Sequence, residues 1–432
     1  MTNCGCRSPR RRCYNPCEPE ASLCFFKKNK IEILSFKRKK KQKLGGEMNR
    51  ITLFRTVPRI VMGPGALNQL ADEVRALKAN KVLIVTDQGL IEAGLVKQAQ
   101  AVLGKADIKY AVFGDVEADP RYEIVADCVE MIRSENADLI IGFGGGSPID
   151  IAKVSAVMAT NEGPISEYFG IDLVPQPGLP TLIIPTTAGT GSEATPIAIL
   201  SDHTEKLKKG IVSPHLFPSV ALLDPELTIG LPGHITAATG MDALIHAIES
   251  FTSKNATSIS DMLARQAMQL IAKKLRNAYA DGSNLEARSN MLEGSLLAGM
   301  AFCTAGVTAV HAFAYPIGAE FHIPHGVANS IMLVPVMEFN KLGNLERFAE
   351  IAGYLGENTA GLSAREAAHA AVEAMRTLAA DLKIPDHLSE FGIKDKDIPE
   401  LAAGVMKVTR LLANNPRELT QKDAEAIYRS VL

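Results

Sequence analysis

Short apolar runs alternate with segments of helical character over the first half of the chain. Five such runs lie at residues 81–86, 110–113, 137–143, 181–185 and 220–224. Apolar runs without polar alternation are typical of parallel strands that are covered on both faces. The pattern therefore predicts an α/β domain, built on a parallel sheet, over residues 48–230.

The pattern changes after Pro232. Long stretches of helical period, rich in Ala and Leu, follow at residues such as 260–280 and 363–382, and β-branched runs become rare. We predict an all-helical domain over residues 231–432 and expect a ligand in the cleft between the two domains. No uncharged apolar stretch reaches the roughly 18 residues that a membrane-spanning helix needs, so we expect no membrane partner.

The first 47 residues differ from the rest in charge and in cysteine content. They carry thirteen Lys and Arg against four Glu, and five of the seven cysteines. A nucleic-acid arm, a metal site and a targeting peptide are alternatives, but the cysteines lack C-x2-C spacing and no signal-peptide core is present. The codons for Gly45-Gly46-Glu47, just before Met48, can form a purine-rich ribosome-binding sequence. We therefore expect Met48 to be the true start, and residues 1–47 to be a disordered basic head that is not native to the protein.

The remaining 385 residues carry a net charge of −11, which gives no electrostatic reason to expect a nucleic-acid partner. Only two cysteines, Cys128 and Cys303, lie in this part. So few thiols suit a reducing compartment and leave no disulfide framework. We therefore expect a cytoplasmic protein.

A glycine-rich loop, Gly144-Gly145-Gly146-Ser147, follows the third apolar run. Three glycines let the backbone approach a pyrophosphate closely, and the N–H groups of the next helix can bind it. We predict that Ser147 caps this helix, that Pro148 takes its first position and that Asp150 completes the cap. The alternative is a plain strand-to-helix turn. Because three glycines exceed what a cap needs, we predict phosphate binding on a Rossmann-like sheet, although the usual G-x-G-x-x-G fingerprint is absent.

Two further loops follow predicted strands. Asp87 closes the first strong strand, where a carboxylate can bond ribose hydroxyls and repel a 2′-phosphate, favouring NAD over NADP. The alternative is an Asp that caps the next helix. Residues 185–192 are rich in small hydrogen-bond donors, which suits either a ligand-lining loop or an ordinary turn.

One carboxylate and several imidazoles have the pattern of a metal site. Asp242 and His246 are four residues apart and share one helix face, although a pair at this spacing is usually a salt bridge. His311 and His325 lie in apolar, Gly-rich surroundings, where an imidazole needs a polar partner or a metal ion. One carboxylate with three imidazoles would bind Fe²⁺ or Zn²⁺. His322 competes with His325, and chemistry alone does not choose between them.

Taken together, these motifs resemble the iron-containing (group III) alcohol dehydrogenases. The resemblance covers Met48 to Leu432 and rests on four segments in the same order: 144–153, 185–192, 239–249, and His311 with 325–329. It implies a nucleotide-binding domain followed by a metal-binding domain. The implied metal ligands are Asp242, His246, His311 and His325, which excludes His322. The implied cofactor contacts are Asp87, Gly145, Gly146, Ser147, Asp150, Thr186, Thr187, Thr195 and Lys208, with Lys209 as the alternative to the last.

The resemblance also implies a reaction. It predicts an Fe²⁺-dependent enzyme, with Zn²⁺ as the alternative metal, that passes a hydride between NAD and the carbon of a small-molecule alcohol or aldehyde. A hydroxyacid–oxoacid transhydrogenase, or a related reductase with tightly held NAD, would share every motif. A non-enzymatic role, as a subunit of a larger assembly, would be expected only if metal ligands were missing from the sequence, and all four are present. We also expect a homodimer or a larger homo-oligomer.

Three positions depart from the family pattern. Many members have a second histidine four residues after the third ligand, where this chain has Tyr315. Because an unperturbed Tyr has a pKa of about 10, it cannot replace imidazole as a base at neutral pH without help. The family's Asn-Pro pair is Asp119-Pro120 here, and Thr304 stands in place of a usual Asn. These departures bear on the substrate range rather than on the reaction type.

Overall fold

The computed structural model describes residues 51–203 and 207–432, so the predicted head lies outside the described residues. Residues 52–432 form one compact unit. No helix of the described part is by itself long and apolar enough to cross a membrane, and one bent pair, Leu285–Ala305 with Ala309–Phe321, passes that test only jointly.

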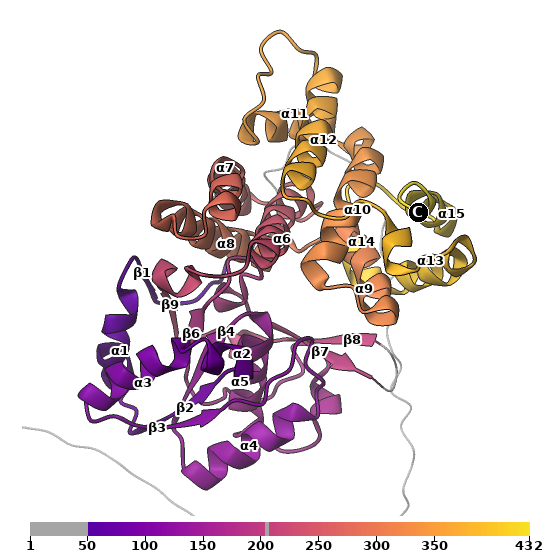
Figure 1. Cartoon of the computed structure of the whole chain (residues 1–432). Coiled ribbons are helices and arrows are strands. Elements are labelled where there is room, and N and C mark those ends of the chain that lie inside the picture. Colours follow the sequence, from indigo (N-terminus) through magenta and orange to yellow (C-terminus); the bar gives the residue numbers. More distant parts are fainter. Residues whose placement is uncertain (1–50, 204–206) are drawn as a thin grey trace, which may run out of the picture. The chain divides into compact units, whose positions relative to one another are not determined.

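A six-stranded parallel sheet has the strand order β1-β9-β6-β4-β2-β3 (Figure 1). Its strands are β1 (Ile60–Met62), β2 (Lys81–Val85), β3 (Lys109–Phe113), β4 (Leu139–Gly144), β6 (Thr181–Pro185) and β9 (Val220–Leu223). The five predicted runs became β2, β3, β4, β6 and β9, so the predicted parallel sheet is confirmed. β1 was not predicted.

Helices cover both faces of this sheet. Alternate side chains of β2 enter two different buried clusters, one shared with α1 and α3 and the other with α4 and α5. These helices are α1 (Leu70–Ala76), α3 (Leu95–Lys105), α4 (Ile124–Glu135) and α5 (Gly146–Met158), and the short α2 (Gln88–Glu92) follows β2. Burial on both faces explains why the strands are continuously apolar.

The chain leaves the neighbouring strands β2 and β4 in opposite directions. From β2 it passes through α3 to β3 at the sheet edge, and from β4 it passes through α5 on the other face towards β6. The carboxyl ends of β2 and β4 therefore form a topological switch point, which is where ligands bind in open α/β sheets. Asp87 and Gly144–Ser147 follow these two strands.

A second sheet of three strands was not predicted. It consists of β5 (Gly170–Ile171), β8 (Leu207–Val212) and β7 (Ile197–Asp202) in the order β5-β8-β7, with β7 and β8 antiparallel. Lys208, Lys209 and Gly210 interrupt the apolar pattern of β8, because this strand is only partly buried.

From residue 233 onwards the described elements are helices, as predicted. They are α6 (Gly233–Thr252), α7 (Ser258–Ala280), α8 (Leu285–Ala305), α9 (Ala309–Phe321), α10 (His325–Asn340), α11 (Leu345–Tyr354), α12 (Ala364–Asp381), α13 (Ile398–Lys407), α14 (Thr409–Leu412) and α15 (Gln421–Arg429), with short 3-10 turns between some of them. The predicted boundary at residue 230 falls between β9 and α6 and stays a prediction.

Two glycines join the loop after β6 to helix α8. A Cβ atom placed on Gly191 would lie 2.6 Å from the Cα atom of Gly299, so the two backbones are in direct contact. Gly191 also has a φ of 61°, in the left-handed region that favours glycine. This contact has no room for a side chain on either residue.

Candidate active site

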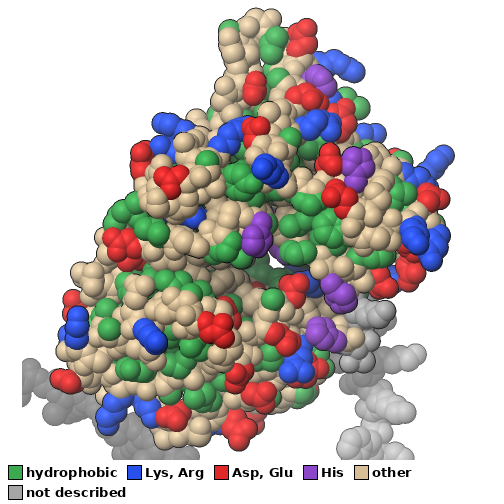
Figure 2. Space-filling view, in the orientation of Figure 1, with side chains coloured by type: hydrophobic (Ala, Val, Ile, Leu, Met, Phe, Trp, Pro, Cys, Tyr) green, Lys and Arg blue, Asp and Glu red, His purple; other side chains and the backbone are tan. Residues whose placement is uncertain are grey.

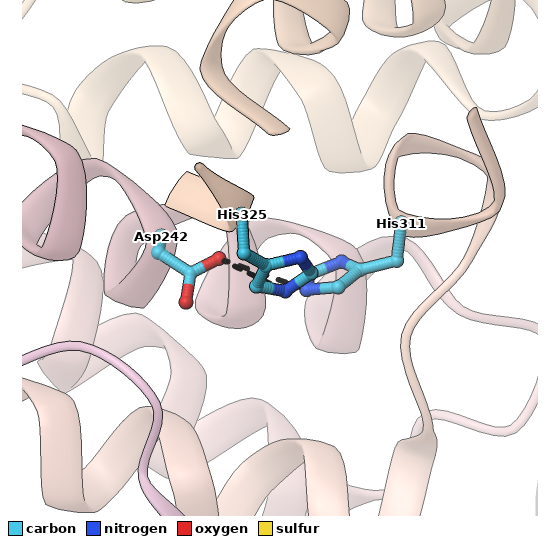
Figure 3. Close-up of side chains that lie close together, drawn as sticks. All are labelled: Asp242, His311 and His325. Carbon is cyan, nitrogen blue, oxygen red and sulfur yellow. Dashed lines mark ion pairs between the residues drawn. The ribbon is translucent and has the colours of Figure 1, made fainter. Parts of the chain in front are cut away.

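Three helices bring the four predicted metal ligands together. Asp242 and His246 lie one turn apart on α6 with only 3% and 6% of their surface exposed. His311 is buried in α9, and His325 is the first residue of α10, which packs against both α6 and α9. The side chains of Asp242, His311 and His325 point toward one another (Figure 3).

The donor atoms of these side chains converge. The Nε2 atoms of His311 and His325 lie 3.8 Å and 3.9 Å from Oδ1 of Asp242. Nε2 of His246 lies 3.0 Å from Nε2 of His311. Such a cluster of one carboxylate and three imidazoles can hold a divalent transition metal.

The hydrogen bonds made by the His246 and His311 rings show whether a metal ion fits between them. Nδ1 of His311 lies 2.5 Å from the Glu249 carboxylate and Nδ1 of His246 lies 3.2 Å from the Gly189 carbonyl, so each Nδ1–H donates. When both rings are neutral, both Nε2 atoms then carry lone pairs and face each other across 3.0 Å. Lone pairs at that separation repel unless a cation lies between them, and metal–nitrogen bonds of about 2.0–2.1 Å suit the gap. The residues therefore fit a bound metal ion.

Glu249 holds His311 in this orientation. Its carboxylate is fully buried on α6 and also accepts hydrogen bonds from the Thr308 hydroxyl at 2.6 Å and the Val310 N–H at 2.7 Å. A histidine that ligates a metal usually donates its other ring nitrogen to a carboxylate or carbonyl. Glu249 was not among the predicted site residues, although an acidic residue three positions after His246 in an apolar helix was a signal for such a role.

Asn329 was also missed. Its side-chain amide is buried and donates to Oδ1 of Asp242 at 2.7 Å, and it lies 3.1 Å from Nε2 of His325. It therefore fixes the carboxylate of the cluster. His322 ends α9 in the left-handed conformation, is exposed, and is not among the converging residues.

Electrostatics keep the cluster in a state suited to metal binding. Burial lowers the pKa of His246 and of His325 to about 4, although Asp242 acts in the opposite direction. Burial raises the pKa of Asp242, but the three histidines outweigh it and the pKa is lowered overall. Burial also lowers the pKa of His311, but Glu249 outweighs it and the pKa is raised. Asp242 as an anion and His246 and His325 as neutral imidazoles are in the form that binds metal, whereas a metal ion must compete with a proton at His311.

The glycine loop differs from the prediction at its cap. Helix α5 starts at Gly146 and its N-cap is Gly145, with no side-chain cap hydrogen bond, so the prediction that Ser147 caps it was wrong. Asp150 does not complete a cap either, because it accepts from the Ser192 hydroxyl at 2.6 Å and the Ile199 N–H at 2.8 Å. The extended backbone at Gly145 starts the helix earlier than a Ser147 cap requires. The first N–H groups of α5 are thus left without a side-chain cap, as an anion site requires.

The other predicted cofactor residues lie around this loop or at the neighbouring strand end. The Asp87 side chain caps α2 by accepting a hydrogen bond from the Leu90 N–H at 2.9 Å, as the capping alternative predicted. Its role in binding ribose stays a prediction. Thr186 donates its N–H to the Gly144 carbonyl at 2.9 Å, and a Cβ on Gly145 would lie 3.5 Å from Oγ1 of Thr187. Thr195 is buried at the end of the short 3-10 helix Ser192–Ala194.

A fully buried lysine, Lys153, fixes the loop that carries the threonines. Its Nζ donates to the carbonyl and hydroxyl of Ser192 at 3.0 Å and 2.8 Å and to the Ile197 carbonyl at 2.5 Å. Burial lowers the pKa of Lys153 to about 8 and raises that of the nearby Glu193 to about 7. The sequence analysis included Lys153 in a motif but assigned it no task.

A cavity of about 560 Å³ lies beside the metal cluster. The predicted cofactor residue Lys208 and its alternative Lys209 both line it, as does Tyr315, whose ring centroid lies 6.1 Å from that of His325. Nζ of Lys208 pairs with Asp119 and its charge lowers the pKa of His325, so Lys208 faces the cluster. In the space-filling view the surface is hollowed near the middle, with histidine, basic and acidic side chains around the opening (Figure 2).

Comparisons with known proteins agree with this geometry. Two family models match, "Iron-containing alcohol dehydrogenase" over residues 58–225 and "Fe-containing alcohol dehydrogenase family, C-terminal" over residues 236–432. The sulfoacetaldehyde reductase of Bilophila wadsworthia is 42% identical over 374 residues, which cover 86% of this chain and 97% of that protein.

Solved structures are similar over the same length. A crystal structure of a 1,3-propanediol oxidoreductase has a TM-score of 0.87 at 41% identity and covers 89% of this chain and 100% of its own. A sulfoacetaldehyde reductase from Bifidobacterium kashiwanohense, solved with NAD⁺, has a TM-score of 0.81 at 32% identity and covers 88% and 99%. The chain therefore belongs to the iron-containing alcohol dehydrogenase family and is an NAD-dependent oxidoreductase that acts on CH–OH groups.

Proposed function

We propose that this oxidoreductase holds its Fe²⁺ through Asp242, His246, His311 and His325. The observation that carries the proposal is the pair of Nε2 atoms of His246 and His311, which face each other across 3.0 Å with both Nδ1 atoms engaged elsewhere. When bound, the metal ion supplies Lewis acidity at the substrate oxygen and NAD supplies the hydride acceptor. Zn²⁺ is the alternative metal, because the same donors suit it.

The side chains around the cluster orient the groups that react. Glu249 keeps the Nδ1 proton of His311 in place, and Asn329 fixes the Asp242 carboxylate. Burial raises the pKa of Tyr315 above its ordinary value, although Arg410 acts in the opposite direction, so the Tyr315 hydroxyl stays protonated and acts as a donor in the cavity. The proton that an alcohol loses must therefore be accepted by another group or by water.

The cofactor contacts are proposed for the residues at the switch point. The N–H groups at Gly146 and Ser147 suit a pyrophosphate, since no side chain caps this helix start. Asp87 is proposed to select NAD by repelling a 2′-phosphate. The remaining proposed contacts are Gly145, Asp150, Thr186, Thr187, Thr195 and Lys208.

The substrate is proposed to be a small alcohol or aldehyde. Relatives carry names such as sulfoacetaldehyde reductase and 1,3-propanediol dehydrogenase, and the cavity of about 560 Å³ is within the usual size range of small-molecule sites. The test is NADH oxidation by Fe²⁺-loaded protein with a panel of short aldehydes. Full activity in metal-free protein would overturn the proposed metal role. Turnover without consumption of free NADH would indicate the transhydrogenase alternative.

Two finer expectations are part of the proposal. A homodimer or larger homo-oligomer suits the edge strand β1, where Ile60 and Met62 are 40% and 46% exposed, since an apolar sheet edge invites pairing. Cytoplasmic localisation suits Cys128 and Cys303, the two cysteines within residues 51–432, which are both free thiols. Light scattering of the purified protein and cell fractionation test them.

A further inference from the structure

The cavity beside the metal cluster has basic side chains on two of its sides. It lies between strands β7 and β8 and helices α9, α13 and α14. Lys208 and Lys209 enter it from β8, and Lys407 and Arg410 from the end of α13 and from α14. Apolar groups such as Pro316 complete the wall.

These four cations differ in their partners. Lys208 is paired with Asp119, and Lys209 with Asp202 at 2.7 Å. Lys407 and Arg410 are exposed and form no ion pair with any residue of 51–203 or 207–432. A guanidinium without a carboxylate partner, facing a ligand cavity, can bind a planar or tetrahedral anion through two parallel hydrogen bonds.

Arg410 lies at the end of the cavity next to the metal cluster. The positive charge of Arg410 lowers the pKa of Tyr315, which burial raises. The positive charge of Lys208 likewise lowers the pKa of His325. The negative groups that act on Tyr315 are Asp242, a proposed metal ligand, and Glu249, the partner of His311.

The carboxylates of the cavity wall do not neutralise this end. Asp397 accepts a hydrogen bond from the Lys394 N–H at 2.9 Å and so caps a short helix. Glu320 and Glu400 also line the cavity, and neither forms an ion pair with Lys407 or Arg410. Lys407 and Arg410 are therefore the cations of the cavity wall that stay available to an anionic ligand.

We propose that the substrate of this enzyme is a short aldehyde or alcohol that carries an anionic group, a carboxylate or a sulfonate, bound by Arg410 with Lys407 beside it. The reacting carbon then lies at the metal cluster and the anionic group, which is unchanged by the reaction, lies at α14. The inference rests on the proposed function, because it places the reacting end at Asp242, His311 and His325.

The kinetic test compares aldehydes that differ in charge. The Fe²⁺-loaded enzyme is assayed with NADH and 4-oxobutanoate, 2-oxoethanesulfonate or the neutral 4-oxobutanamide. We expect kcat/KM to favour at least one anion by about tenfold to a hundredfold, the range of a charge-assisted hydrogen bond. The two anionic substrates distinguish carboxylate from sulfonate. Arg410→Gln should remove the preference by raising KM for the anion, with the amide unaffected, and Arg410→Lys should retain part of it.

Arg365→Gln is the matched control, because Arg365 is exposed on α12 and its loss changes the net charge equally. An enzyme that reduces neutral aldehydes without preferring either anion overturns the inference and leaves the proposed function standing. A second measurement does not need turnover: calorimetry without NAD, with 4-hydroxybutanoate against 4-hydroxybutanamide. Tighter binding of the anion that disappears in Arg410→Gln supports the inference even where no aldehyde is reduced, and equal binding contradicts it.

Discussion

Replacing Glu249 by Gln tests whether its charge sets the proton on His311. The carboxylate accepts three hydrogen bonds, from Nδ1 of His311 at 2.5 Å, from Thr308 at 2.6 Å and from Val310 at 2.7 Å. Gln has almost the same shape but only one acceptor oxygen. If that oxygen stays with Thr308 and Val310, the new NH₂ group faces Nδ1 of His311, which must then accept.

The proton of His311 then moves to Nε2, the atom 3.0 Å from His246, where it blocks a ligand position. Loss of a carboxylate that orients a ligating histidine typically costs 10–100-fold in metal affinity. We expect Fe²⁺ and Zn²⁺ affinity to fall by about that factor, or roughly 1.4–2.7 kcal/mol, from the factor of ten per 1.36 kcal/mol. NAD binding should persist, since the glycine loop is separate from Glu249.

The assay is metal content after equilibration with a chelator of known affinity, with NAD affinity measured on the same samples. Glu193→Gln is the control, because Glu193 is also a buried glutamate but has no contact with the histidines, and one of its oxygens has no hydrogen-bond partner. Unchanged metal affinity in Glu249→Gln, or an equal loss in Glu193→Gln, would refute the reasoning.

Four further predictions follow from the same observations. Asp87→Gly should relax the preference for NAD over NADP, measured as the ratio of kcat/KM values, with little loss of stability because Gly is tolerated as an N-cap; a wild-type enzyme that uses both cofactors equally contradicts it. His325→Ala should lose metal and turnover while His322→Ala keeps both, and equal metal loss in the two variants would exclude the assignment. Burial raises the pKa of Glu193 to about 7 from 4.5 in the unfolded chain, so the stability of the wild type relative to Glu193→Gln should fall as pH rises from about 4.5 to 7; denaturant titrations of both proteins at pH 5 and pH 8 measure this difference, and an unchanged difference contradicts it. A chain that begins at Met48 should fold and turn over like the full chain, and loss of soluble protein on that truncation would count against a non-native head.

Most of the strands that could be predicted are buried on both faces, and the edge strand β3, with two exposed residues, is the exception. β2, β4 and β6 are almost wholly buried and appear in the sequence as continuous apolar runs. β1 is apolar but only three residues long, and β8 carries two lysines and a glycine, so the first is too short and the second too polar to be recognised as an apolar run. These strands form because a neighbouring strand supplies backbone partners, which the local sequence does not record.

The candidate ligands could be proposed from chemistry, but their surroundings could not. Asp242, His246, His311 and His325 lie together, and their role as ligands stays a prediction. Glu249 and its partner His311 are 62 positions apart, so only the packing of α6 against the segment before α9 brings them into contact. The cap at Ser147 was predicted wrongly because side-chain preference favours Ser, whereas the extended backbone at Gly145 starts the helix earlier.

The contact between Gly191 and Gly299 has a mechanical consequence. The loop after β6 also accepts the hydrogen bond of His246 through the Gly189 carbonyl, so two neighbouring points attach this loop to the helical part. Backbones packed this closely cannot separate without exposing polar groups, so a movement of the helical part relative to this loop would be a rotation about the contact. A swing about it would leave the distance between this loop and His246 nearly unchanged. A movement that opened the cavity between β8 and α14 to admit substrate would then leave the metal cluster in place relative to the loop that follows β6.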